Sequence, residues 1–558
     1  MFAPYPQALA LGILSVSVVL YCLTKALSGD AITRMKPTQP TVGLRKEWIS
    51  YPRSCLRSVF RTRDWAFEAY QKYSKVNAFC VLPSIDRGRL LVVPPRQIRK
   101  VYGLPVESLD VHKTANRTIQ TDWTIWDKEV SDNDFQMNLI RNQLTRNLDV
   151  LTPGIAQELE NGFRHEWGES MEDWKTIDLW ASVMRIIGGA ANSAFCGKPL
   201  CRDADFINRI HSHSMWIFLG SLLINCTPKP LRPLTGGIVG WACYFCLKRV
   251  SKLGLPLVKE RLHHTALLKE DPSYTWVPPQ DGLQWMIDEC YATGDPAQLN
   301  PDRILHRLVF INDISLHSTS YTTMNVILEL ASADPSLGYI EALREESARV
   351  LKEAGGKWTR KAVTKLNLVD STIRESMRLT PFNSVGLPRT VVNPHGTVVD
   401  NGSSSLRVPC GASVVIPVQP IHYDNELYPR ATTFDPFRFA RPTSFSNILD
   451  SIDATSPSPG TGEKARDSGE DKVKSSATVD DAFLGFGFGK HACPGRFFAL
   501  NEVKIFVAQM VLNYNIEHLE RGKPEMTPVI WLNMPLFTNL GVRVRRRNPV
   551  ELSREDDN

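Results

Sequence analysis

The stretch Phe486-Gly-Phe-Gly489-Lys-His491-Ala-Cys493-Pro494-Gly495 decides how this chain folds and which chemistry it can carry. It places Cys493 between two glycines, which allow backbone angles and close approaches that other residues do not. Pro494 suits the first position of a helix, so we expect a helix that starts near Gly495, with Cys493 at its N-terminus. The helix dipole and the free N–H groups at that end lower a thiol pKa and favour a thiolate.

A thiolate in this position has three possible uses: as a nucleophile, as a zinc ligand or as a haem ligand. Zinc is disfavoured because no Cys or His accompanies Cys493 at the spacing of a zinc site. His422 could serve a Cys–His hydrolase, but no oxyanion-hole motif is apparent. The residues alone leave the choice between a nucleophile and a haem ligand open.

The spacing F-x-x-G-x-x-x-C-x-G resembles the haem-binding signature of the cytochromes P450, the haem-thiolate monooxygenases. Phe486, Gly489, Cys493 and Gly495 fill all of its fixed places. The resemblance implies haem b as cofactor, with Cys493 as the axial thiolate ligand of the iron. Such a thiolate pushes electron density onto iron and favours cleavage of the O–O bond. Phe486 would shield the sulfur atom.

Two further motifs strengthen the resemblance. Glu375 and Arg378 are spaced i, i+3 and therefore share one helix face. Taken alone, they would form a commonplace surface ion pair. In the family this E-x-x-R pair is buried and is joined by an arginine of an F-x-P-x-R segment, which Phe434-Asp-Pro436-Phe-Arg438 matches. Breaking a buried Glu between two Arg leaves an unpaired charge, so we assign these three residues to stability.

The haem propionates need cationic or hydrogen-bonding partners. By resemblance, Arg389 and His491 occupy positions that serve this purpose in the family, and Arg141 is a further candidate. Gln136, on the same helix as Arg141, stands where related sequences often place a histidine. Arginine suits bidentate binding of a carboxylate, and histidine can donate a hydrogen bond. Each of these residues could equally be a surface polar group.

The oxygen-activating helix of the family reads (A/G)-G-x-(D/E)-T-(T/S), and Ile314-Ser-Leu-His317-Ser318-Thr319 departs from most of it. His317 stands where the acid is expected and Ser318 where the alcohol is expected, with Thr319 next. A hydroxyl there would open the helix ladder and relay protons to dioxygen, and His317 could deliver protons or simply contact substrate. The departure leaves room for a haem-thiolate isomerase or dehydratase, or for a non-catalytic haem protein. Because hydroxyls remain at both positions, we favour monooxygenation.

The resemblance also implies partners. Electrons would come from NADPH through a separate membrane-bound reductase, because the chain contains no flavin or nicotinamide module. Lys490, Arg496 and Lys504 lie near Cys493 and could form a basic docking face. The segments Leu144–Leu148 and Cys493–Ala499 look like those of filamentous fungi, in which such enzymes often tailor polyketides, terpenoids or alkaloids. We expect a lipophilic, medium-sized substrate, bordered by Phe310, Asn312, Asp313 and the apolar zone 214–247.

The N-terminus indicates a membrane anchor. Residues 1–24 contain no Asp, Glu, Lys or Arg, and Ala8–Thr24 is almost wholly apolar. About 20 apolar residues span a bilayer core. Lys25, Arg34 and Lys36 follow, which favours a cytosolic catalytic domain on the endoplasmic reticulum membrane, with a single-pass helix within residues 1–28. A cleaved signal peptide is the alternative, and the apolar zone 214–247 is either core helix or a membrane-dipping surface.

Composition fits this interpretation. Hydrophobic residues are 43% and charged residues 22%, which excludes a disordered chain and a polytopic membrane protein. A net charge of +6 is too small to indicate nucleic acid. Length alone would suggest three or four domains, whereas the resemblance implies one haem domain over 29–558, with a flexible insertion at 443–480. The expected fold is mainly α with a small β-rich lobe, the triangular helical prism of the cytochrome P450 fold. Long helices are predicted at 135–165, 301–332, 340–354 and 366–379, and a last one ending near Tyr514.

Overall fold

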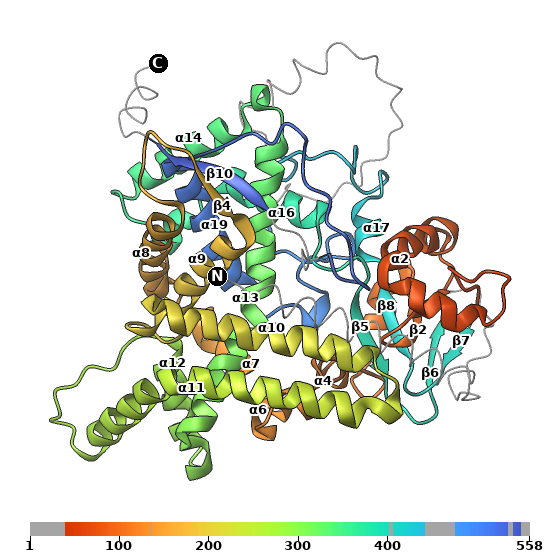
Figure 1. Cartoon of the computed structure of the whole chain (residues 1–558), viewed down its shortest axis with the longest axis horizontal. Helices are drawn as coiled ribbons and strands as arrows, with labels where there is room; N and C mark the ends of the chain where they lie inside the picture. Colours follow the sequence, from red (N-terminus) through yellow and green to blue (C-terminus); the bar gives the residue numbers. More distant parts are fainter. Residues whose placement is uncertain (1–38, 134, 401–404, 441–474, 534–539, 548–558) are drawn as a thin grey trace.

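The computed structural model describes residues 39–133, 135–400, 405–440, 475–533 and 540–547. Helices dominate the chain, as predicted (Figure 1). In the first half of the chain they are α2 (Ser50–Lys72), α3 (Ile98–Tyr102), α4 (His112–Ile119), α5 (Thr121–Thr124), α6 (Lys128–Asp132), α7 (Phe135–Leu139), α8 (Leu148–Trp167), α9 (Leu179–Phe195), α10 (Ala204–Cys226) and α11 (Arg232–Glu270). They continue as α12 (Gly282–Ala292), α13 (Pro301–Ser332), α14 (Tyr339–Glu353), α15 (Arg360–Val363), α16 (Asn367–Leu379), α17 (Val418–His422) and α19 (Arg496–Asn513).

The strands form three small sheets. The largest has the order β1 (Cys80–Ser84), β2 (Gly88–Val92), β8 (Ser413–Ile416), β5 (Gly386–Val391) and β3 (Leu109–Asp110). Its pairs are antiparallel except β2 with β8, and Cys80 pairs with Val92. This sheet and α2 lie together at one side of the helical body (Figure 1). The other sheets join β4 (Lys175–Asp178), β10 (Gly541–Arg546) and β9 (Tyr514–Ile516), and β6 (Thr397–Asp400) with β7 (Ser405–Val408).

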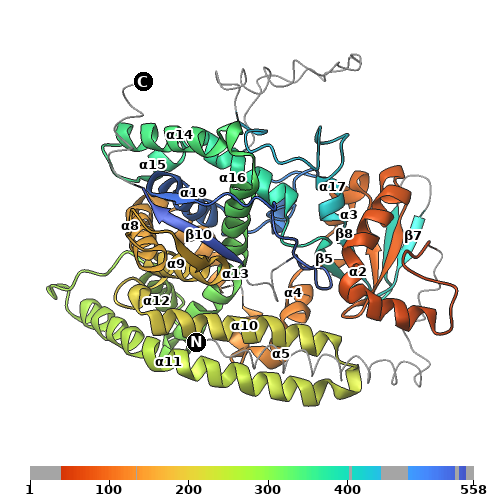
Figure 2. The same ribbon diagram turned by 45° about the horizontal axis from the view of Figure 1, so that its top comes forward.

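Helix α13 runs through the middle of the helical body (Figures 1 and 2). It begins where the Asn300 side chain accepts hydrogen bonds from the N–H groups of Asp302 and Arg303, with Pro301 in the first turn. This arrangement satisfies backbone donors that a helix start leaves open. Helices α8, α9, α16 and α19 contribute with α13 to one large apolar core. Because α13 is buried on most sides, its residues contact several different neighbours.

Most of the predicted helices are confirmed, with one difference. The helix expected at 135–165 is interrupted by a π-helical turn over Ile140–Leu144. Helix α2 packs inward through Cys55, Val59 and Trp65. The two apolar zones within 214–247 belong to α10 and α11, which lie side by side along one edge of the molecule (Figures 1 and 2).

The predicted anchor within residues 1–28 lies outside the described residues, as does most of the insertion predicted at 443–480. Within the described ranges, no helix combines the length and apolar character that crossing a bilayer requires.

Candidate active site

A cavity of about 430 Å³ lies beside Cys493 and α13. One wall consists of the loop that carries Phe486, Gly487 and Cys493, and the opposite wall includes Ser315, Ser318 and Thr319 of α13. The remaining lining is largely apolar and comes from several elements, among them Met137, Ile140, Leu144, Ile187, Ala191, Phe195, Met377, Leu387, Val418 and Leu484. An apolar cavity with a few polar groups is the usual form of a small-molecule site.

The loop around Cys493 is shaped by its glycines and its backbone hydrogen bonds. Gly489 has φ +63° and Gly487 has φ +88°, both in the left-handed region that favours glycine. The Cys493 N–H donates to the Phe486 carbonyl over 2.8 Å, which closes the loop. Gly495 has an ordinary φ of −84°, and helix α19 begins one residue later, at Arg496. A Cβ at Gly495 would lie 3.8 Å from Ile140, an ordinary contact distance.

The surroundings of the Cys493 thiol act on its pKa in opposite directions. Burial raises its pKa, and this effect outweighs the N–H groups of Gly495 and Arg496 and the Arg496 charge, all of which lower it. Cys493 is nevertheless exposed by its surface area, so the thiolate expected at this helix N-terminus stays a prediction. A metal ion deprotonates a coordinating thiol outright. The environment suits a metal ligand better than a free nucleophile.

His422 does not act with Cys493. Its ring is fully buried, accepts a hydrogen bond from the Leu484 N–H at Nε2 (3.0 Å) and donates from Nδ1 to the Arg378 carbonyl (3.1 Å). Both ring nitrogens are thus used by the backbone. Burial, with the nearby Arg378 charge, lowers the pKa of His422 to about 3. The structure gives His422 a structural role and leaves the Cys–His hydrolase without its base.

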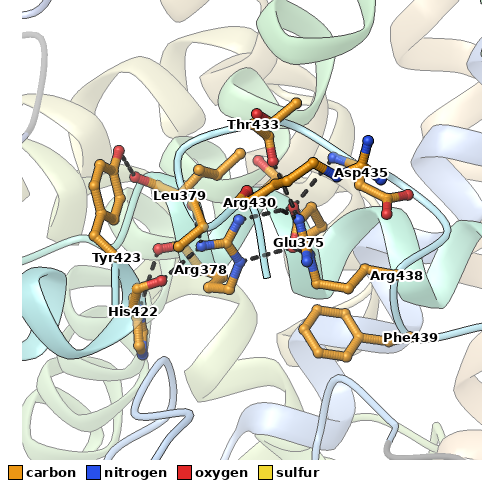
Figure 3. A network of polar contacts seen from close by, with 12 residues as sticks. Glu375, Arg378, Leu379, His422, Tyr423, Arg430, Thr433, Asp435, Arg438 and Phe439 are labelled. Atoms are coloured by element: carbon orange, nitrogen blue, oxygen red, sulfur yellow. Dashed lines mark hydrogen bonds and ion pairs between the residues drawn. The ribbon is translucent and has the colours of Figure 1, made fainter. Parts of the chain in front are cut away.

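The Glu375–Arg378–Arg438 cluster is confirmed (Figure 3). Glu375 is fully buried, and both of its oxygens accept from Arg378, each over 2.8 Å. Arg438 Nε lies 3.1 and 3.0 Å from the same two oxygens. Arg378 also donates to the carbonyls of His422 and Ala431. The cluster therefore links α16 to the later chain segment that contains His422, Ala431 and Arg438.

The α13 hydroxyl groups lie where the sequence predicted them. Ser318 and Thr319 both line the cavity. Thr319 Oγ1 donates to the Ser315 carbonyl over 2.9 Å, and Ser318 Oγ approaches the same carbonyl at 3.4 Å. Thr322, one turn further on, also lines the cavity. Side-chain bonds of this kind compete with the backbone ladder of the helix.

His317 faces away from this cavity and is not among its lining residues. Its Nε2 lies 2.7 Å from Ser214 Oγ of α10, and its ring packs near Phe218 and Trp180. Burial lowers its pKa to about 3. Residues 317 and 318 point about 100° apart around a helix of 3.6 residues per turn, so only Ser318 reaches the cavity. The prediction that His317 relays protons or touches substrate therefore lacks a geometric basis.

The other predicted pocket residues are also elsewhere. Asn312 exchanges side-chain hydrogen bonds with Asn192 of α9, and Asp313 pairs with His213 of α10. Phe310 packs against a separate apolar cluster around Ile217. None of the three lines the cavity.

Cations gather at one end of the Cys493 loop. Arg389 is 7% exposed, and its Nη1 donates only to the Pro388 carbonyl, over 2.9 Å. Burial lowers its pKa, and among the residues the structure describes no carboxylate pairs with it. Burial lowers the pKa of His491, and the charges of Arg389, Lys490, His112 and Arg141 lower it further. Such a cluster of like charges calls for an anionic ligand.

Comparison with known proteins decides the family. The family model described as Cytochrome P450 matches residues 278–538. The protein named cytochrome P450 monooxygenase okaG, from Penicillium ochrochloron, is 42% identical over 92% of this chain and 95% of its own length. Cytochrome P450 monooxygenase gloP from Glarea lozoyensis is 31% identical over 97% of both chains. Cytochrome P450 monooxygenase htyF from Aspergillus rugulosus is 32% identical over 88% of this chain and 70% of its own.

This chain belongs to the cytochrome P450 family. It is therefore a haem-dependent oxidoreductase whose cofactor has a cysteine thiolate as axial ligand. The residues of this P450 fit such a group in two ways. Cys493 faces a largely apolar cavity, and Arg389 is a buried cation without a carboxylate partner among the described residues, which suits it and its neighbour His491 to bind the haem carboxylates.

His112 is a member of this cation cluster that sequence reasoning missed. It lies at the start of α4, and its ring centroid is 6.3 Å from that of His491, nearly perpendicular to it. Nothing local in the sequence marks it, because 379 residues of chain separate the two rings. The π-helical turn that contains Arg141 is the second missed feature. It inserts one residue per turn and so changes which α7 neighbours share a face with Arg141.

Glu502 is a further missed residue. This P450 places it on the cavity wall, 1% exposed, and its Oε1 has no hydrogen-bond partner among the residues that the structure describes. Burial holds its pKa well above the usual range, so the carboxyl group favours its protonated form. Glu502 is the single acidic residue of the largely apolar helix α19, and this was the signal that could have found it.

The predicted basic docking face is smaller than expected. Lys504 is mostly buried and pairs with Asp370 over 2.7 Å. Arg496 donates to the Cys493 carbonyl over 2.9 Å and lies over the Phe497 ring. Of the three predicted residues, Lys490 is the one that is exposed. Lys504 therefore serves the fold, because its charge is already neutralised.

Proposed function

We propose that this P450 is a monooxygenase that inserts one oxygen atom from O2 into a lipophilic small molecule. The reaction is R–H + O2 + two electrons + two protons giving R–OH + water. The observation that carries the proposal is the cavity itself, which places Cys493 opposite the α13 hydroxyl groups and lines the space between them with apolar side chains. Haem, when bound to Cys493, supplies the activation of dioxygen.

The chain's own residues would do the rest. Arg389, His491, Arg141 and His112 would bind and orient the haem carboxylates through charge-assisted hydrogen bonds. Phe486 would shield the sulfur from water. Apolar residues of the cavity wall would hold the substrate carbon and exclude water, which protects reactive species from side reactions.

Proton delivery would run along α13. Thr319 Oγ1 and Ser318 Oγ both lie near the Ser315 carbonyl, so either hydroxyl can pass a proton by rotating about its C–O bond. Thr322 and the buried carboxyl group of Glu502 line the same cavity. Burial holds the pKa of Glu502 well above its usual range, so this carboxyl group keeps its proton, and no hydrogen bond joins it to the α13 hydroxyls among the described residues.

The substrate class rests on the relatives and on the cavity. Relatives named cytochrome P450 monooxygenases come from filamentous fungi such as Penicillium ochrochloron and Aspergillus rugulosus. We assign this chain to fungal secondary metabolism, where it would tailor a polyketide, terpenoid or alkaloid. The cavity of about 430 Å³ beside Cys493 would also hold the haem, and its largely apolar lining supports a lipophilic substrate. Electrons would come from NADPH through a separate reductase, which exposed Lys490 would help to dock.

We also propose that the enzyme sits on the endoplasmic reticulum membrane with its catalytic domain in the cytosol. The apolar run Ala8–Thr24 supports an anchor.

A second feature supports contact with lipid. Large apolar side chains on one face of α11 are exposed at helical spacing: Leu234 (66%), Ile238 (58%), Trp241 (71%) and Phe245 (63%). Residues 206–259 contain seven Lys or Arg and no Asp or Glu, which suits an anionic surface.

The membrane proposal is tested with the full chain in vesicles that contain brominated lipids, which quench nearby tryptophans. Trp241→Phe should remove a quenched component of the fluorescence. Trp174→Phe replaces an indole that lies under Arg543 and Arg545, away from α11, and should leave that component intact. Equal quenching in wild type and Trp241→Phe would contradict lipid contact by this face of α11.

The reaction proposal is tested in microsomes that contain the protein and its reductase, with candidate pathway intermediates and labelled O2. A product that carries one labelled oxygen atom and depends on NADPH is the expected result. A product that forms without O2 or NADPH would identify a haem-thiolate isomerase or dehydratase instead. The absence of turnover across lipophilic candidates of many classes would favour a non-catalytic haem protein.

A further inference from the structure

Two polar contacts join α10 to α13 on the side of α13 that faces away from the cavity. Ser214 Oγ lies 2.7 Å from His317 Nε2, and His213 Nδ1 lies 3.1 Å from the Asp313 carboxylate. All four side chains are buried, with His213 and Asp313 exposed by only 4% and 5%. His213 and Ser214 are adjacent on α10, and Asp313 and His317 are one turn apart on α13. The two contacts therefore act on the same turn of each helix.

The direction of the hydrogen bonds can be worked out. Ser214 Oγ also lies 3.4 Å from the Asp313 carbonyl, which can only accept. If the serine donates there, it accepts at its lone pair from His317 Nε2–H. His317 Nδ1 then carries no hydrogen, and this nitrogen has no partner. An unpartnered acceptor costs less than an unpartnered N–H, so this arrangement is the favourable tautomer.

The environment keeps His317 in place. Its ring lies parallel to Trp180 of α9, 6.4 Å away at 10°, and near Phe218 and His211 of α10 at 5.7 and 5.9 Å. The titratable groups around it are His211, His213 and Asp313, and Arg185 acts on His211. Burial lowers the pKa of His211 to about 4, so neither imidazole brings a charge into the contact near neutral pH.

These two contacts act on the turn of α13 that carries the hydroxyl groups lining the cavity, and we call them the clamp. Ile314, Ser315 and Ser318 line the cavity and alternate along α13 with Asp313 and His317, which face α10. The Ser315 carbonyl, which accepts from Thr319 Oγ1, lies in the middle of this turn. Side-chain bonds to helix carbonyls loosen the backbone ladder, so this part of α13 needs support from outside the helix.

We propose that Asp313 and His317, held by His213 and Ser214 of α10, are positioning residues that fix the α13 turn bearing Ser315, Ser318 and Thr319. His317 thus stands where the family pattern expects an acid, yet it acts through the helix instead of on the reacting atoms. The relevance to oxygen activation rests on the proposed monooxygenase function, whereas the clamp itself is a property of the fold.

Hydrogen exchange of the haem-loaded protein, measured by mass spectrometry, tests the clamp without any turnover. Ser214→Ala and His317→Phe each remove the bond, and the phenylalanine keeps the aromatic packing. Each should speed exchange in peptides covering 314–323 about fivefold, which corresponds to one lost hydrogen bond of about 1 kcal/mol. The double variant should exchange no faster than either single variant, because both remove the same bond.

Two controls sharpen the result. Ser212→Ala, on the same helix, removes a hydroxyl that bonds only its own helix at Asn208 and should leave the exchange unchanged. His317→Gln keeps a side-chain donor that His317→Phe lacks, so it should exchange as slowly as the wild type. Unchanged exchange in the single variants, multiplied effects in the double variant, or an equal rise in peptides of α16 would each overturn the proposal. A failure of the monooxygenase assay would leave these exchange rates unaffected, so the two proposals fail separately.

Discussion

The Leu484 N–H donates a hydrogen bond to Nε2 of His422 over 3.0 Å. Leu484 lines the cavity beside Cys493, and the His422 carbonyl accepts from Arg378 of the buried ion cluster. One histidine therefore connects the Glu375 cluster, which has no access to the cavity, with the wall of the site. The E-x-x-R motif supports the Cys493 loop through this connection.

Glu375→Gln should lower the free energy of unfolding strongly, because it leaves Arg378 and Arg438 buried without a counter-charge. Loss of one partner from a buried ion pair costs about 3–5 kcal/mol. Urea unfolding and haem content after purification measure the effect. Glu353→Gln is the matched control, because its pairs with Lys365 and Arg349 are exposed and such pairs are worth about 0–1 kcal/mol. Similar losses in the two variants would refute the assigned role of the cluster.

The pH dependence of stability should reflect His422. Its pKa falls from an ordinary 6.5 to about 3 on folding, so below about pH 6.5 the unfolded chain binds the extra proton. The free energy of unfolding should therefore decrease as the pH falls from 6.5 toward 3, with this residue contributing up to about 1.4 kcal/mol per pH unit. His422→Gln should make the slope between pH 4 and 6 shallower by about one proton. His165→Gln, at an exposed position, should not; an unchanged slope in His422→Gln would count against the buried neutral ring.

Thr319→Ala should divert electrons from product to hydrogen peroxide, because it removes the hydroxyl that bonds the Ser315 carbonyl. Loss of a proton-transferring group costs about 100-fold or more in the step it assists. Peroxide formed per NADPH consumed measures the diversion, and Thr319→Ser should restore coupling. Thr323→Val removes a hydroxyl that bonds the Thr319 carbonyl outside the cavity lining, and it should couple normally. If Ser318→Ala uncouples and Thr319→Ala does not, the relay runs through Ser318 alone.

Arg389→Ala should release haem faster, because a buried cation without a carboxylate partner is the strongest candidate to bind a propionate. A hydrogen bond between charged groups contributes about 1.5–3 kcal/mol, or roughly tenfold or more in the dissociation rate. Transfer of haem to an excess of apomyoglobin gives this rate. Arg407→Ala, on the exposed side of β7, should retain haem like the wild type.

The sequence was informative where short motifs carry the geometry. The Cys493 loop, the ion cluster of Glu375 and helix α13 over 301–332 all lie as predicted. Prediction from the sequence failed where a residue's role depends on which side of a buried helix its side chain lies. His317 and Ser318 are neighbours, yet only the packing of α10 against α13 decides that one contacts Ser214 and the other lines the cavity.

The sequence also failed to predict contacts between residues that lie far apart along the chain. Lys504 was predicted to be free for docking, but its partner Asp370 lies 134 residues earlier and is brought near it only by the packing of α16 on α19. The Cys493 thiol follows the same rule. Its helix N-terminus is local and was predicted, whereas the burial that raises its pKa comes from the whole cavity.

The ligation of haem by Cys493 is the central claim, and the carbon monoxide spectrum of the reduced protein tests it most directly. The wild type and Cys410→Ala, which removes the other exposed cysteine among the described residues, should show the red-shifted Soret band of a thiolate-bound haem. Cys493→Ala should lose that band. The same band in Cys493→Ala, or its absence from intact wild-type protein that contains haem, would contradict the account.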